Sequence, residues 1–336
     1  MTPFVIPVFL PHSGCPHRCV FCDQSAVSGA PAAPNPLEAF RRATQRFLSF
    51  KRKKNRPSQV SFYGGNFLGQ SRETVLSLLE AAEELVKKEK IDSVRFSTRP
   101  DSVGEETLDI LKGFSVKTIE IGVQSMDDGV LSLAGRGHSA LDTKRAVFLL
   151  KKRGYETGAQ LMTGLPGDDG EKSLFTARKI GGLPFDFARI YPVLVFKNTV
   201  LASWLQNGRY TPPSLERSVR TAAEMCQTLA QNHVPVIRMG LQDEPGAVDQ
   251  ILAGPRHPAF GHLVLSRIFL EKAAGAIEGS GKKPGTAVLK VHPGSVSKMT
   301  GMNRRNIRAL KERFGLKDVR VVADDSAGKD EVRVCF

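Results

Sequence analysis

The stretch Gly14-Cys15-Pro16-His17-Arg18-Cys19-Val20-Phe21-Cys22-Asp23-Gln24 places three cysteines within eight residues near the start of the chain. The chain has only two other cysteines, Cys226 and Cys335, and both lie far from this stretch. Three thiolates spaced Cys-x3-Cys-x2-Cys can each bind one iron of a cubane cluster, which leaves the fourth iron without a protein ligand. The pattern therefore predicts an iron–sulfur cluster with one open coordination position.

A zinc site is the alternative interpretation of these cysteines, with His12 or His17 as the fourth ligand. Structural zinc sites usually combine two pairs of ligands from two loops, and this chain has no second pair of cysteines. The spacing therefore favours an iron–sulfur cluster over zinc. Cys226 falls in an expected helix and Cys335 lies near the end of the chain, so we expect neither to be a ligand.

The length and composition are those of a globular protein that can bury a large core. The chain has 336 residues, enough for one large domain of barrel or open-sheet type with a small appendage. No apolar run is long enough to span a bilayer, and residues 1–10 lack the basic start and cleavage site of an export signal. The odd number of cysteines, three of them crowded together, agrees with a reducing compartment. We expect a cytoplasmic protein with no membrane segment.

Strand-like and helix-like patterns alternate along most of the chain. We expect strands at 5–10, 59–63, 93–97, 118–123, 157–162, 187–195 and 236–239, and helices at 37–50, 72–88, 105–112, 140–153, 172–180 and 213–232. Repeated βα units of this kind predict an α/β protein whose parallel strands roll into a full or partial barrel.

The regular alternation of strand-like and helix-like patterns ends after Pro255. The last part of the chain predicts a strand at 287–292, a helix at 297–314, and strands at 319–323 and 331–336, which is the order of a small α+β unit. We therefore divide the chain into a barrel, residues 1–242, and a C-terminal extension, residues 243–336. The extension is basic, because residues 281–336 contain 13 Lys and Arg against 6 Asp and Glu, half of the formal net charge of +14.

The segment from Cys15 to Cys22, with an aromatic residue before the last cysteine, resembles the cluster loop of radical S-adenosylmethionine (SAM) enzymes. The resemblance implies a partial (β/α)6-type TIM barrel and a [4Fe-4S] cluster bound by Cys15, Cys19 and Cys22. SAM would bind the open iron. One electron from the cluster, delivered by a donor such as flavodoxin or ferredoxin, would then cleave SAM to a 5′-deoxyadenosyl radical.

Further motifs follow in the order that the resemblance implies, and all of them except the one at Arg136 lie directly after an expected strand. They are Phe62-Tyr63-Gly64-Gly65-Asn66-Phe67, Ser97-Thr98-Arg99-Pro100-Asp101, Gly122-Val123-Gln124-Ser125, Arg136-Gly137-His138 and Met162-Thr163-Gly164-Leu165-Pro166-Gly167. Together they resemble the catalytic subunit of Elongator, with the oxygen-independent coproporphyrinogen oxidases as more distant relatives. In a βα barrel all these strand ends meet on one face, where active sites lie.

The resemblance also implies which residues contact SAM, while no residue is assigned as catalytic. Glycines allow the backbone to approach the methionine amino group closely, because no Cβ intrudes. The implied SAM contacts are Gly64, Gly65 and, through the backbone, Asn66; Gln124 at the ribose with Ser125 beside it; and Arg136 at the carboxylate.

The predicted function is a radical SAM enzyme that modifies RNA, of the tRNA wobble-uridine type. The Elongator likeness and the basic extension both point to this substrate, and a helix through residues 303–311 would present Arg and Lys to phosphates. One alternative is radical chemistry on an anionic small molecule of tetrapyrrole or CoA type. A second is a non-enzymatic, metal-bearing RNA-binding protein. Elongator subunits also use acetyl-CoA in a separate domain, which we do not expect here because the tail lacks a glycine-rich pyrophosphate loop before a helix.

Overall fold

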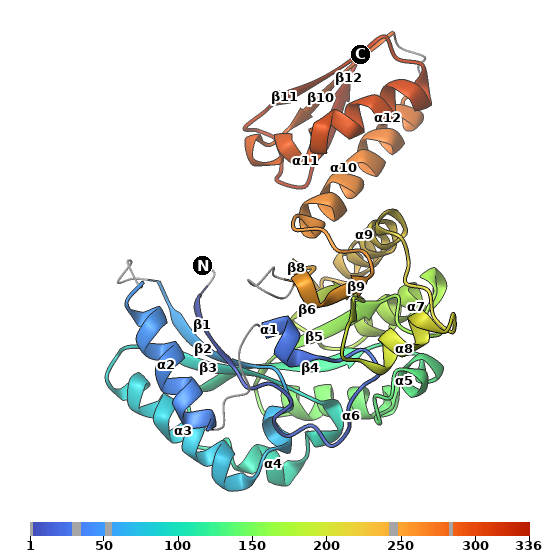
Figure 1. The fold of residues 1–336 in the computed structure, drawn as a ribbon. Coiled ribbons are helices and arrows are strands. Elements are labelled where there is room, and N and C mark those ends of the chain that lie inside the picture. The colour runs from blue at the N-terminus through green and yellow to red at the C-terminus, as the bar shows by residue number, and fades with distance from the viewer. Residues whose placement is uncertain (1–2, 29–34, 51–55, 242–247, 282–284) are drawn as a thin grey trace.

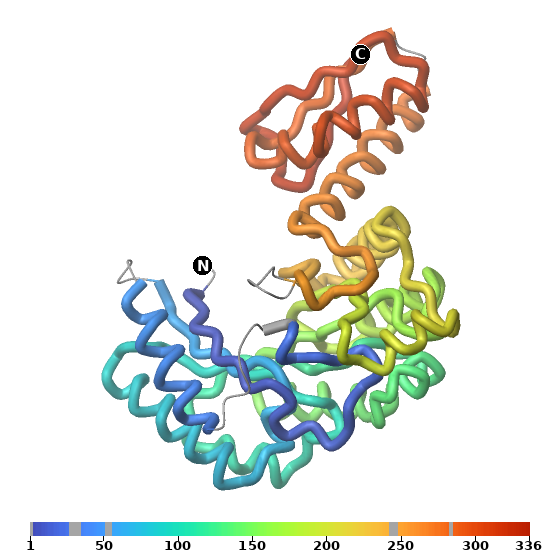
Figure 2. Tube along the Cα trace, viewed as in Figure 1, coloured from blue at the N-terminus to red at the C-terminus, as the bar shows by residue number. Residues whose placement is uncertain are grey.

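A computed structural model describes residues 3–28, 35–50, 56–241, 248–281 and 285–336. Figure 1 shows a curled sheet with helices along its outer side, and a smaller unit at the C-terminal end. Figure 2 follows the chain from the sheet, through one long helix, into that smaller unit. Within the described residues no helix combines the length and apolar character needed to cross a bilayer.

The main sheet contains seven strands, and every neighbouring pair in it is parallel. Along the sheet the order is β1 (Phe4–Phe9), β2 (Ser58–Tyr63), β3 (Ser93–Thr98), β4 (Val116–Gln124), β5 (Glu156–Thr163), β6 (Phe187–Pro192) and β8 (Val236–Met239). The helices between them are α2 (Pro36–Leu48), α3 (Arg72–Lys87), α4 (Glu105–Asp109), α6 (Ala140–Lys152), α7 (Gly170–Gly181) and α9 (Leu215–Gln231). The expected partial barrel is confirmed, with β8 as a seventh strand after six βα units.

Shorter elements surround the ends of the strands. They are α1 (Gln24–Ser28), α5 (Asp128–Leu133), α8 (Val200–Gln206), and a two-stranded antiparallel sheet of β7 (Val195–Phe196) and β9 (Ile251–Ala253). The expected strand 187–195 was too long. The main ladder ends at Pro192, which has no N–H to donate, and the chain then turns to pair with β9.

The two faces of the main sheet differ in chemistry. Alternate residues such as Val60, Phe62, Ile119 and Ile121 are buried in the core between the sheet and the outer helices. The residues between them face the inside of the curl and are largely polar, among them Ser61, Tyr63, Ser97, Glu120, Gln160, Arg189 and Tyr191. The inner face is therefore not an apolar core and is available to bind ligands.

A buried ion pair cluster holds neighbouring strands together on this inner face. The Glu120 side chain is fully buried and lies 2.5 Å from Arg95 Nε of β3 and 3.0 Å from Arg189 Nε of β6. Gln160 of β5 donates to Glu120 Oε2 at 2.9 Å. One carboxylate thus compensates two buried guanidinium groups.

Helix α10 (Phe260–Gly279) connects the barrel to the C-terminal unit, and the sequence patterns did not reveal it. Phe260 and Val264, near its start, belong to the core of the barrel, whereas Phe269 and Ile277 belong to a second core. Because its two ends are covered by different partners, its apolar residues do not form the single stripe from which amphipathic helices are recognised.

The C-terminal unit is a three-stranded sheet covered by helices. Its strand order is β11 (Asp318–Ala323), β10 (Thr286–Val291), β12 (Val332–Cys335), with β10 parallel to β11 and antiparallel to β12. The expected α+β extension is confirmed. The expected division between residues 242 and 243 lies outside the described residues.

The single helix expected at 297–314 is wrong, because the structure has two helices there. Helix α11 (Val296–Thr300) stops at Gly301, whose φ of 72° and ψ of 164° only glycine adopts readily. Asn303 and Arg304 also have positive φ, and α12 (Arg305–Phe314) begins after them.

We predict that Glu120→Gln lowers the free energy of unfolding by about 3–5 kcal/mol, because two buried arginines lose their counter-charge. Urea unfolding of the metal-free protein measures this value. Glu105→Gln is the matched control, since it removes a carboxylate that pairs with Arg153 at the surface. Equal effects of the two substitutions would contradict the role given to Glu120.

Candidate cofactor and substrate site

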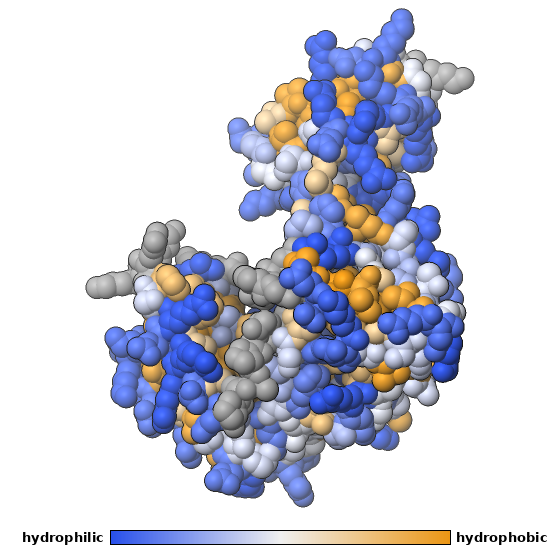
Figure 3. Space-filling model, in the orientation of Figure 1, coloured by the Kyte–Doolittle hydropathy of each residue, from blue (hydrophilic) through white to orange (hydrophobic). Residues whose placement is uncertain are grey.

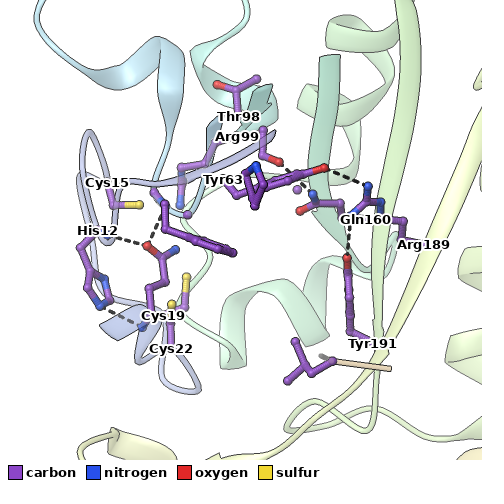
Figure 4. Close-up of a pocket in the computed structure, with 18 of the residues that line it drawn as sticks. His12, Cys15, Cys19, Cys22, Tyr63, Thr98, Arg99, Gln160, Arg189 and Tyr191 are labelled. Carbon is purple, nitrogen blue, oxygen red and sulfur yellow. Dashed lines mark hydrogen bonds between the residues drawn. The ribbon is translucent and has the colours of Figure 1, made fainter. Parts of the chain in front are cut away.

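A cavity of about 1050 Å³ lies inside the curl of the main sheet. This volume is at the upper end of ordinary ligand pockets, so it has room for a cofactor and part of a second molecule. Seven of the nine residues expected to bind the cluster or SAM line it: Cys15, Cys19, Cys22, Gly64, Gly65, Gln124 and Arg136. In Figure 4 the cysteines lie on one side of the cavity, and Gln160, Arg189 and Tyr191 lie on the opposite side.

Gln24 fixes the loop that carries the cysteines. Its side-chain oxygen accepts a hydrogen bond from the backbone N–H of His12 and another, of 2.6 Å, from that of Gly65. The backbone N–H of Gln24 in turn donates to His12 Nε2 at 3.1 Å. Burial lowers the pKa of His12, and the positive charge of the nearby Arg18 lowers this pKa further. This direction agrees with a neutral ring that accepts the bond. The loop is thus closed on itself and attached to the end of β2.

The glycines at the end of β2 allow two backbone segments to touch. Gly65 has a φ of 60°, and a Cβ there would lie 2.2 Å from the carbonyl oxygen of Ser13. A Cβ on Gly14 would lie 2.3 Å from the carbonyl oxygen of Asn66. Side chains at these positions would therefore separate the cysteine loop from β2.

Asn66 and Ser125 are buried behind the wall of the cavity. The Asn66 amide donates to Gly14 O at 3.0 Å and to Ser102 Oγ at 2.7 Å, and its oxygen accepts from Thr98 and from the backbone of Arg99. Its side chain therefore joins the cysteine loop to the end of β3. Ser125 Oγ lies 3.3 Å from Thr176 Oγ1 and accepts from the backbone N–H of Asp127. Both residues support the wall, and their contact with SAM stays a prediction.

Arg136 lies between the cysteines and the end of β4. Its Nη1 donates to Cys19 Sγ at 3.2 Å and its Nη2 donates to Gly122 O at 2.7 Å. Its Nε and the Nη1 of Arg99 are buried with no hydrogen-bond partner among the described residues. Buried donors left without partners are expected where an anionic ligand binds. Gln124 beside them has a φ of 65°, an unusual backbone conformation that often marks binding sites.

The donor set fits a cluster that binds one thiolate per iron. Burial and the neighbouring Cys19 and Cys15 raise the pKa of the Cys22 thiol to about 12, so a strongly positive group is needed to deprotonate it. No three His, Cys, Asp or Glu side chains in the described part of the chain are grouped closely enough to hold one metal ion. A cubane does not need such a group, because each thiolate binds a different corner.

The wall opposite the cysteines is built around Arg189, which no sequence motif indicated. Arg189 donates to Tyr63 Oη at 3.1 Å and to Tyr191 Oη at 3.3 Å, while Gln160 donates to Ser97 Oγ at 2.9 Å. Figure 4 shows Tyr63 reaching across the cavity toward Arg189. The available signal was the alternation of polar and apolar residues within each strand, which identifies the inward positions.

The cavity is strongly basic. There is no Asp or Glu among its described lining residues. Seven arginines line it: Arg18, Arg42, Arg46, Arg99, Arg136, Arg189 and Arg238. Glu120 pairs with Arg189 and Asp101 pairs with Arg99, and these two carboxylates compensate only part of the charge. Such a lining favours anionic ligands.

Comparison with known families identifies the superfamily of the chain. The model of the radical SAM superfamily matches residues 9–179, and that of the radical SAM C-terminal domain matches residues 185–269. The chain belongs to the radical SAM superfamily. Radical SAM enzymes use a [4Fe-4S] cluster together with SAM.

Two curated relatives show how far the similarity extends. A tRNA uridine(34) acetyltransferase of Dehalococcoides mccartyi is 26% identical over 230 residues, which are 59% of this chain and 50% of that protein. The heme chaperone HemW of Lactococcus lactis is 25% identical over 232 residues, which are 68% of this chain and 60% of that protein. The chain spans about half the length of the acetyltransferase that it matches.

A solved structure confirms the fold. Elp3 of Methanocaldococcus infernus superposes with a TM-score of 0.62 and 22% identity, over 82% of this chain and 64% of the other. At this identity the likeness establishes the radical SAM partial barrel and nothing about the substrate.

We predict that Gln24→Ala weakens iron binding about 10–100-fold, as loss of a side chain that orients metal ligands does. Iron content per chain, measured after anaerobic reconstitution and challenge with a chelator, tests this. Gln231→Ala, at an exposed position at the end of α9, is the control. Normal iron retention by Gln24→Ala would show that the loop holds its shape without this side chain.

Proposed function

We propose that Cys15, Cys19 and Cys22 bind three irons of the [4Fe-4S] cluster and that the cavity beside them binds SAM. Gly64 and Gly65 would bring the backbone close to the methionine amino group, and the unpartnered Nε of Arg136 would hold its carboxylate. Gln124, at the end of the neighbouring strand, would contact the ribose. The cluster and SAM, when bound, supply the radical chemistry, and the chain orients the reacting molecules.

We further propose that the substrate is RNA, of the tRNA-uridine type. The observation that carries this is the lining of seven arginines with no carboxylate among the described lining residues, which suits a substrate with several phosphates. Arg42 and Arg46 extend it along α2 to exposed positions, where a large substrate can contact them. The name of the acetyltransferase relative supports the choice of tRNA.

The second candidate is an anionic small molecule of tetrapyrrole type. The heme chaperone relative favours it, and a basic cavity binds carboxylates as well as phosphates. The two candidates differ in size, so they make different demands on the rim of the cavity.

We predict that Cys19→Ser abolishes cluster binding and formation of 5′-deoxyadenosine from SAM, because one iron loses its thiolate. Product is measured by chromatography after anaerobic reconstitution and reduction with dithionite. Cys335→Ser is the control, since that cysteine is exposed at the far end of the chain. A Cys19→Ser protein with wild-type product formation would refute the ligand assignment.

We predict that total tRNA changes the rate of 5′-deoxyadenosine formation at least severalfold, and that CoA esters and porphyrinogens do not. Arg42→Glu should weaken the response to tRNA, because it reverses a charge at the rim. Arg41→Glu is the matched control, as Arg41 is an exposed neighbour on the same helix that does not line the cavity. If only the small molecules changed the rate of 5′-deoxyadenosine formation, the substrate would be a small molecule and not RNA.

A further inference from the structure

A second basic surface lies on the C-terminal unit, along helix α11, the turn at residues 301–304 and helix α12. We call residues 298–311 the helix-turn surface. Its cations are Lys298, Arg304, Arg305, Arg308 and Lys311. Arg305 pairs with Glu216, and Lys311 lies 3.9 Å from Asp318. No carboxylate of the described residues forms an ion pair with Arg304 or Arg308, and Arg308 donates only to the carbonyl oxygen of Asn303.

Buried contacts fix the conformation of the turn in this surface. Asn306 is buried, and its amide donates to Ser266 O of α10 at 2.8 Å and to Lys298 O of α11 at 3.1 Å. A Cβ on Gly301 would lie 3.0 Å from the Asn306 side chain, so the close packing of the turn requires glycine. The side chains above, Met302 and Asn303, are exposed and make no contribution to the core. The turn is therefore a fixed structure that presents its outer residues to solvent.

An unpaired strand edge runs beside the helix-turn surface. Both α11 and α12 pack against β11, an outer strand that, within the described residues, pairs only with β10. The free edge of such a strand offers N–H and C=O groups that can bond to a partner. Met302 in the turn is 41% exposed, so apolar contact is available next to the charges. Figure 3 shows apolar and hydrophilic side chains side by side on this unit.

We propose that the helix-turn surface and the edge of β11 together bind single-stranded RNA. The pattern Gly301-x-x-Arg304-x-x-Ile307, between two helices, corresponds to the G-x-x-G loop with which KH modules clamp four consecutive nucleotides by their backbone. Arg304 takes the place of the second glycine, with its backbone in the left-handed region at a φ of 60° and a ψ of 29°, and adds a cation.

The chemistry of the two sides assigns them different parts of the ligand. Arg304 and Arg308 would contact a chain of phosphates, whereas the free edge of β11 and the exposed Met302 suit the edges and faces of bases. Base edges are accessible in this way only when they are unpaired, which selects single strands, loops and ends over duplex. The proposal rests on the proposed function only for the choice of RNA, because its residues lie outside the cavity.

The test is binding of a fluorescein-labelled ten-nucleotide single-stranded RNA to the full chain, followed by anisotropy. We expect the double substitution Met302→Asp with Asn303→Asp to weaken binding at least tenfold, because two carboxylates then face the phosphates. Both residues are exposed, and an unchanged thermal unfolding transition verifies that the variant folds. The matched control is Gly275→Asp with Gly279→Asp, which adds the same charge to α10 where a Cβ meets nothing within 4 Å. We expect the control to bind within twofold of the wild type.

Three results would overturn the proposal. Wild-type binding by the turn variant would exclude the turn, and an equal loss in the control would show that only overall charge matters. Equal affinity of the wild type for the same strand annealed to its complement would exclude single-strand selection. The outcome is separable from that of the proposed function, because stimulation of 5′-deoxyadenosine formation by tRNA is measured independently. Turn-dependent binding without stimulation refutes the RNA substrate alone, and stimulation with turn-independent binding refutes this inference alone.

Discussion

The parallel strands of the main sheet must bury one face and leave the other open, and the rest of the molecule depends on this constraint. Parallel sheets are usually covered on both faces and have nearly continuous apolar strands. Here the strands alternate, with Val60 and Phe62 packed outward and Ser61 and Tyr63 directed inward. The inner polar groups are compensated by one another, above all through Glu120, so the barrel stays open without an apolar filling. An open, polar interior is what a large cofactor and a substrate both need.

The position of the cysteine loop follows from the same architecture. The loop leaves β1 at the end where all parallel strands terminate, and the contact of Gly65 with Ser13 brings it against the end of β2. Arg136, which comes from a distant part of the sequence, reaches Cys19 because the segment after β4 opens at the same edge. The order of the strands thus brings side chains that are distant in sequence to one site, which several segments of the chain build together.

Much of this could be predicted from sequence, for identifiable reasons. The strands and helices before residue 239 follow clear periodicities, and the cysteine spacing indicates its chemistry directly. The long helix α10 could not be found, because its apolar residues serve two cores. The break at Gly301 was missed because helix propensity continues on both sides and only the close packing against Asn306 requires a turn. Arg189 was not assigned to the site because no motif identifies it; it gains its place through its inward orientation and its contact with Tyr191. Sequence patterns report local periodicity, whereas these features depend on contacts between distant segments.

The two basic regions should serve different purposes if both proposals hold. Arg99, Arg136 and Arg189 are buried in the cavity, so their charges are weakly screened and favour a defined arrangement of anionic groups. The cations of the helix-turn surface are mostly exposed, and their attraction to phosphates falls with salt. Binding at the exposed surface raises the effective concentration of the same RNA at the cavity, provided that the chain can span both sites. The cavity can then stay selective without binding RNA tightly, because the C-terminal unit supplies the affinity and the enclosed arginines need only position the reacting nucleotide.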